Sequence, residues 1–126
     1  MKTIPVKIGG KELRLAFTLD AMSMLQECVP EFDMNKLASY AKTPKGLADM
    51  VYVMAQQGEL LEGRHLDVDR AWIGCHIAPS PGRIARIQIA VLNTLAEWMH
   101  METEDDDEYE HDVTLEQIRK KETAAG

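Results

Sequence analysis

Apolar and polar positions alternate with a period of two along the first seventeen residues, a pattern typical of β-strands. Two apolar series flank the turn pair Gly9-Gly10, with Ile4, Val6 and Ile8 before it and Leu13, Leu15 and Phe17 after it. Two consecutive glycines permit the positive φ angles of a tight hairpin turn. Pro5 cannot donate to a strand ladder, so we expect the first strand at an edge. The pattern predicts a β-hairpin, which needs a helical partner to be stable.

The spacing of the apolar positions changes to three and four after this hairpin, which indicates helices. Five are predicted, each beginning after a candidate N-cap: Thr18, Asp33, Thr43, Asp67 or Asp69, and Ser80. Pro30 should end the first helix, and Gly58 or Gly63 the third. The fifth helix is the longest and is apolar on more than one side, so we expect it in the centre of the core.

Formal charge divides the chain of 126 residues, whose total is −7, into two parts. Residues 1–101 contain eleven basic and eleven acidic side chains and are neutral, whereas residues 102–112 contain eight acids and no Lys or Arg. Because like charges repel, the acidic run is expected to be a flexible, solvated linker. The sequence therefore predicts a mainly α fold: an N-terminal β-hairpin packed on a bundle of about five helices (residues 1–101), then a flexible acidic C-terminal segment (residues 102–126).

Composition also restricts the class of protein. A body without net positive charge disfavours general binding of nucleic acid. No apolar run is long enough to span a membrane, and the first residues lack the apolar stretch of a secretory signal. The two cysteines, Cys28 and Cys75, are too few for a disulfide framework and are expected as small buried side chains in a reducing cytoplasm. We expect a cytoplasmic protein that binds neither membrane nor nucleic acid.

Residues 65–76 contain the side chains that most resemble a chemical site. His65, Asp67, Asp69, Cys75 and His76 can all bind metals, but the spacing matches no paired zinc motif. Asp67 or Asp69 is better explained as a helix cap. Cys75 and His76 are adjacent on a helix and point in different directions, so they do not form a nucleophile–base pair, and Cys75 is expected to pack with Trp72 on the core side. We predict no catalytic, cofactor-binding or metal-binding residues and no cofactor.

Side chains suited to a protein partner are found elsewhere. Arg83 and Arg86 lie at the start of the fifth predicted helix, where they could contact an acidic partner. Methionines on the predicted apolar faces are most simply core residues, but thioethers also suit surfaces that accept varied partners. The candidate partner-binding residues are Met22, Leu25, Met50, Met54, Arg83 and Arg86. A methionine-rich surface could equally support self-association into a homo-oligomer.

One stretch suggests a family. The hairpin running into LRLAFTLDAMSMLQE resembles the opening of the tail assembly chaperones of long-tailed phages and prophages, through Gly10, Lys11, Glu12, Leu15, Phe17, Thr18, Ala21, Leu25 and Glu27. The similarity extends as a pattern of elements from residue 4 to about residue 100. It implies a non-enzymatic protein of the bacterial host cytoplasm that binds the tape-measure protein and recruits tail-tube subunits during tail assembly. The acidic run would then be a spacer to a C-terminal extension.

Two other functions compete with this interpretation. A small virion structural protein, such as a tail or head–tail connector subunit, would share the same context but stay in the particle. A DNA-binding regulator would use the fourth and fifth helices as a helix-turn-helix, although the neutral body and acidic tail argue against it. An enzyme is the least expected class, because no catalytic set of residues is evident.

Overall fold

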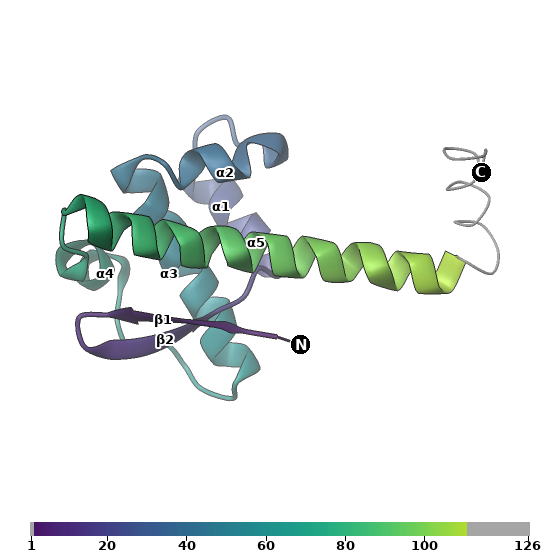
Figure 1. The fold of residues 1–126 in the computed structure, drawn as a ribbon, viewed down its shortest axis with the longest axis horizontal. Coiled ribbons are helices and arrows are strands. Elements are labelled where there is room, and N and C mark those ends of the chain that lie inside the picture. Colours follow the sequence, from purple (N-terminus) through teal and green to yellow (C-terminus); the bar gives the residue numbers. More distant parts are fainter. Residues whose placement is uncertain (1, 111–126) are drawn as a thin grey trace. The chain divides into compact units, whose positions relative to one another are not determined.

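The predicted hairpin and helices are present in the computed structural model, which describes residues 2–110, with side chains described for residues 2–99. Two strands are followed by helical elements (Figure 1) in the order β1 (Ile4–Ile8), β2 (Lys11–Leu15), α1 (Leu19–Cys28), the short 3₁₀ helix η1 (Met34–Lys36), α2 (Leu37–Tyr40), α3 (Pro44–Leu61), α4 (Arg70–His76) and α5 (Pro81–Glu110). The fold is mainly α with an N-terminal antiparallel hairpin, as predicted.

The described chain divides into two units, with the boundary between Leu95 and Ala96. The boundary lies within α5, before the predicted start of the acidic segment at residue 102. The helix continues from there through Glu110, and no Gly or Pro interrupts it. Residues 111–126, which include the rest of the predicted flexible segment, lie outside the described residues.

The hairpin turn lies at Gly9-Gly10, as the sequence predicts. Gly9 and Gly10 have φ angles of +58° and +83°, which glycine adopts without steric penalty. The strands pair in antiparallel register, with Pro5 opposite Arg14. The backbone N–H of Arg14 donates to the Glu59 carboxylate at 2.9 Å and so points away from β1. Pro5 therefore occupies a pair without ladder hydrogen bonds, where its missing N–H has no consequence.

Side-chain caps begin the helices as the sequence predicts. Thr18, Asp33 and Thr43 accept backbone N–H groups at the starts of α1, η1 and α3, and Asp69, not Asp67, does so for α4. Ser80 accepts the N–H of Arg83 at 3.4 Å at the start of α5. The third helix runs past Gly58 to Leu61, and Gly63 follows with a φ of +82°.

The centre of the first unit is α3, which packs against β2, α1, α2 and α4. It contributes ten buried residues, whereas residues 81–95 of α5 contribute only Ile87, Val91, Thr94 and Leu95. The expectation that the fifth helix would be central is therefore wrong. Ile89 and Leu92 are 58% and 37% exposed, so the additional apolar positions of this helix face solvent in the described chain.

The free edge of β2 is closed by the C-terminal half of α3. The N–H of Ala16, just after the strand, donates to the carbonyl of Met54 at 3.1 Å, and the N–H of Arg14 donates to Glu59. Gly58 lies between these two contacts. A Cβ at this position would collide with the backbone carbonyl of Arg14. Glycine at position 58 is thus a requirement of close approach between helix and strand.

We expect Gly58→Ala to lower the free energy of unfolding by at least about 1–3 kcal/mol, because neither backbone can yield locally. Gly82→Ala is the matched control, since an added Cβ there meets nothing within 4 Å. That variant should be unchanged or up to about 1 kcal/mol more stable, as alanine favours helix. Urea denaturation followed by circular dichroism measures both. Equal midpoints for Gly58→Ala and wild type would contradict the close approach.

Candidate functional site

The six residues predicted to bind a partner separate into buried and exposed groups. Leu25, Met50 and Met54 have no exposed surface, because α1 and α3 pack against each other. A partner docking on the folded chain cannot reach them, so these three are core residues and not partner-binding residues. Met22 is half-buried on α1, while Arg83 and Arg86 are exposed on the first turns of α5.

Both arginines line a groove of about 540 Å³. One wall is β1 with the Gly9-Gly10 turn, another is the first part of α5, and the end of α4 with the following residues closes the groove. The lining residues are Ile4, Pro5, Val6, Lys7, Ile8, Gly9, Gly10, His76, Ile77, Ala78, Arg83, Arg86, Ile87, Ile89, Ala90 and Asn93. Most of the lining is apolar, so the groove combines an apolar surface with a few polar side chains.

Residues 81–95 of α5 present different faces to different surroundings. Ile87, Val91 and Leu95 recur every four residues and are buried. A second stripe of Arg83, Arg86, Ala90 and Asn93, spaced by three and four, lines the groove. The helical period thus places the two arginines beside β1 while the core face of the same helix stays apolar.

The groove carries only positive formal charges. Its charged lining residues are Lys7, Arg83 and Arg86, and its lining contains no Asp or Glu. Within residues 2–99, none of these three side chains forms an ion pair or a side-chain hydrogen bond. Three cations therefore gather in one groove, without a partner from the described part of the chain, although residues 1–101 carry no net charge.

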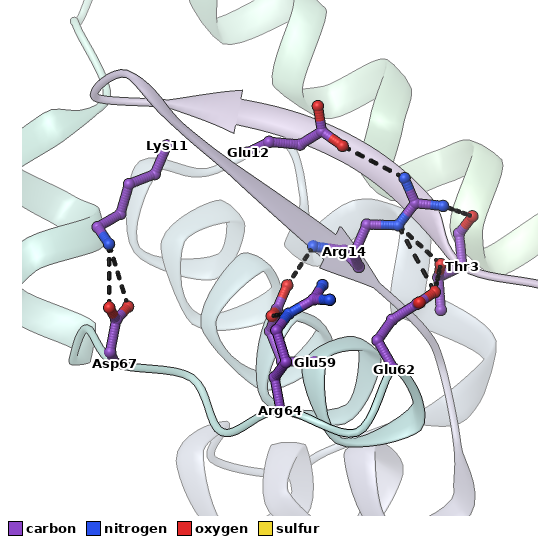
Figure 2. A network of polar contacts seen from close by, with 8 residues as sticks. All are labelled: Thr3, Lys11, Glu12, Arg14, Glu59, Glu62, Arg64 and Asp67. Carbon is purple, nitrogen blue, oxygen red and sulfur yellow. Dashed lines mark hydrogen bonds and ion pairs between the residues drawn. The ribbon is translucent and has the colours of Figure 1, made fainter.

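The other arginines whose side chains are described have partners. Figure 2 shows Arg14 joined to Thr3, Glu12 and Glu62, and Arg64 joined to Glu59 at 2.6 Å. Arg70, the first residue of α4, binds Asp49 of α3 at 2.6 Å. These arginines hold elements of the fold together, which distinguishes them from Arg83 and Arg86.

Two buried carboxylates in these contacts have perturbed acidities. The hydrogen bond from Arg64 lowers the pKa of Glu59 below its ordinary value, and the N–H of Arg14 adds to this against the opposing effect of burial. Burial raises the pKa of Asp49, but hydrogen bonds from Lys45 at 2.7 Å and Arg70 outweigh it, so that the pKa of Asp49 is also lowered. Both groups are ionised at neutral pH and stabilise the fold as carboxylates.

The residues considered for metal binding or nucleophilic chemistry have structural contacts. Asp67 binds Lys11 at 3.0 Å (Figure 2) and Asp69 caps α4. The rings of His76 and Trp72 stack with centroids 4.0 Å apart, and His76 Nδ1 donates to the Trp72 carbonyl at 2.8 Å. Among the residues that the structure describes, no group of three His, Cys, Asp or Glu side chains could hold a metal ion.

The cysteines differ from expectation. Cys28 and Cys75 are both exposed, and Cys75 does not pack on the core side beside Trp72. On α4, Ile73 is the buried residue, and Cys75 lies two positions later, about 200° around the helix. The interpretation of both cysteines as small buried side chains is therefore wrong.

A second groove of about 400 Å³ lies among the start of α3, α4 and the beginning of α5. Its cations are Lys42, Lys45 and Arg70. Lys45 and Arg70 already bind Asp49, so less positive charge is available there for a ligand. The groove beside β1 is the stronger candidate site.

Sequence reasoning found the arginines of this site but missed its other wall. Lys7 and the apolar residues of β1 lie far from Arg83 along the chain, and local spacing does not connect them. The stripe that continues from Arg86 to Ala90 and Asn93 was the available signal, because its spacing marks one face of a helix.

Comparisons with models of protein families, with curated protein sequences and with solved structures find no match to the chain. Among the described residues, no helix has both the length and the apolar character needed to cross a bilayer.

The lowered pKa of Glu59 predicts a dependence of stability on pH. Its carboxylate stabilises the fold fully above the pKa of the unfolded chain, and this stabilisation is lost as the pH falls below about 5 toward the folded-state pKa. Glu59→Gln should lower the free energy of unfolding at pH 7 by about 1–3 kcal/mol, since Arg64 and the Arg14 N–H lose a charged acceptor, and should reduce the slope of stability against pH in the acidic range.

Denaturation midpoints measured from pH 7 to pH 3 test this expectation. Glu12→Gln is the control, because Glu12 forms a pair with Arg14 at 3.4 Å and is 59% exposed. Exposed pairs contribute little, so this variant should stay within about 0.5 kcal/mol of wild type. If both variants gave the same profile, the assigned role of Glu59 would be wrong.

Proposed function

We propose that this chain is a non-enzymatic tail assembly chaperone of a long-tailed phage or prophage, acting in the cytoplasm of the bacterial host. In this role it binds the tape-measure protein and recruits tail-tube subunits. The observation that carries the proposal is the groove between β1 and α5, which offers an apolar surface beside cations that have no partner among residues 2–99.

The groove suits an amphipathic segment of a larger partner. Such segments bind by placing their apolar side chains in a groove while their polar side chains meet its rim. Ile89, on the groove side of α5, keeps more than half of its surface exposed. An apolar side chain beside apolar β1 residues gains from being covered. A tape-measure protein rich in long helices supplies segments of this kind.

The sequence resemblance supports the same proposal from another part of the chain. Gly10 forms the turn, Leu15 and Phe17 are buried, and Thr18 caps α1. Ala21 and Leu25 on α1 face the core. The matching residues thus specify the corner where the hairpin enters the first helix, and β1 of this hairpin forms a wall of the groove.

Co-expression with the tape-measure protein of the same phage or prophage tests the proposal. We expect the chain to increase the soluble fraction of that protein and to co-purify with it. Ile89→Glu should reduce both effects, because a carboxylate would replace an apolar contact in the groove. Leu92→Glu is the matched control, since Leu92 is also exposed on α5 but does not line the groove.

A tape-measure protein that is equally insoluble with and without the wild-type chain would contradict the proposed function. Mass spectrometry of purified particles separates the chaperone from a virion structural protein. A chaperone should be missing from finished particles, whereas a tail or connector subunit should be present in stoichiometric amount.

A further inference from the structure

We infer that the groove between β1 and α5 selects an acidic amphipathic helix, with two carboxylates about one helical turn apart and apolar side chains next to them. The inference rests on the proposed function in that both place the partner in this groove, and it adds the chemistry by which the partner is recognised. The carboxylates meet Arg83 and Arg86, and the apolar side chains cover Ile89, Ala90 and the two residues of β1 that keep apolar surface exposed, Ile4 and Pro5.

Charge complementarity is the first argument. The lining contains Lys7, Arg83 and Arg86 but no acid, although residues 1–101 have equal numbers of basic and acidic side chains. Every other arginine with a described side chain is paired with a carboxylate. Arg83 and Arg86 are the exceptions, and they line the same groove. A carboxylate from outside the described chain would give them the partner that the other arginines have.

The beginning of α5 strengthens the positive potential at the same place. Its first turn contains no acidic residue, although acids are the side chains that stabilise the positive end of a helix dipole. Arg83 lies instead near that end, where a cation is unfavourable. An incoming carboxylate would be attracted both by the guanidinium groups and by the helix start.

Spacing specifies the arrangement of the acids. Arg83 and Arg86 are three residues apart on one helix, so their Cβ atoms lie about 5–6 Å from each other on one side. Two carboxylates three or four residues apart on a partner helix have the same separation. Arginine can also bind a carboxylate through two parallel hydrogen bonds, which fixes orientation.

The apolar part of the lining favours a polypeptide over nucleic acid. Ile4 is half-buried and Ile89 is 58% exposed in the same groove, and a phosphate backbone would leave both uncovered. Nucleic acid binding also draws on many phosphate contacts, whereas this groove offers three cations on a body, residues 1–101, without net charge.

Fluorescence anisotropy with the full chain tests the inference. The probe is a labelled synthetic amphipathic helix with a leucine face and two Glu residues four apart, and a second probe has Gln in place of both Glu. We expect the Glu probe to bind wild type at least about tenfold more tightly than the Gln probe, and the preference to decrease as salt is added.

The double variant Arg83→Gln with Arg86→Gln should bind the Glu probe about tenfold more weakly than wild type does. Its affinity for the Gln probe should be unchanged. The matched control is Lys36→Gln with Lys42→Gln, which removes the same charge from exposed lysines outside the groove. It should bind the Glu probe like wild type. If only the double arginine variant loses affinity, and only for the Glu probe, the arginines recognise the carboxylates directly. A general effect of net charge would weaken binding in both double variants.

Three results would overturn the inference: equal affinity of wild type for both probes, equal weakening by the two double variants, and displacement of the Glu probe by a short DNA duplex. The failure of the proposed function is distinct from these. If the acidic probe binds as expected but the tape-measure protein stays insoluble, the groove chemistry holds and the chaperone function does not.

Discussion

The contact between β2 and the C-terminal half of α3 is the constraint on which the rest of this structure depends. Gly58 brings the helix against the carbonyl of Arg14, and Met54 and Glu59 accept the backbone N–H groups of Ala16 and Arg14. A two-stranded hairpin is marginal by itself. Closing its edge with a buried helix satisfies the strand's hydrogen bonds and fixes where β1 lies. The wall of the candidate groove is therefore set by a contact on the other strand.

Arginine has two separate uses in this chain. Where it joins elements, as Arg64 and Arg70 do, it binds a carboxylate with little exposed surface, namely Glu59 or Asp49, and the lowered pKa values of these acids reflect that pairing. Breaking such a pair leaves a poorly solvated charge, which is strongly unfavourable. Arg83 and Arg86 form no such pair with residues 2–99, so replacing them removes no carboxylate contact that holds this part of the fold together. This separation makes the groove experimentally accessible.

Much of the local structure was predictable because it is encoded by neighbouring residues. Gly9-Gly10 sets a turn through backbone sterics, and caps such as Thr18 and Thr43 act on N–H groups three residues away. The central position of α3 was not predictable in this way. Its apolar stripe and that of α5 look similar in sequence, and the difference is decided by which helix a strand can approach closely, through Gly58.

The sequence by itself determined the mainly α class, the hairpin, the helix starts and the candidate arginines, since each depends on interactions within one turn or one strand. Only the tertiary structure decided that Met50 and Met54 are core, that the cysteines are exposed, and that Lys7 lines the same groove as Arg83 and Arg86. The physical reason is that burial and charge pairing are properties of residues distant in sequence. A methionine or an arginine has the same local pattern whether it faces the core, a carboxylate or an open groove.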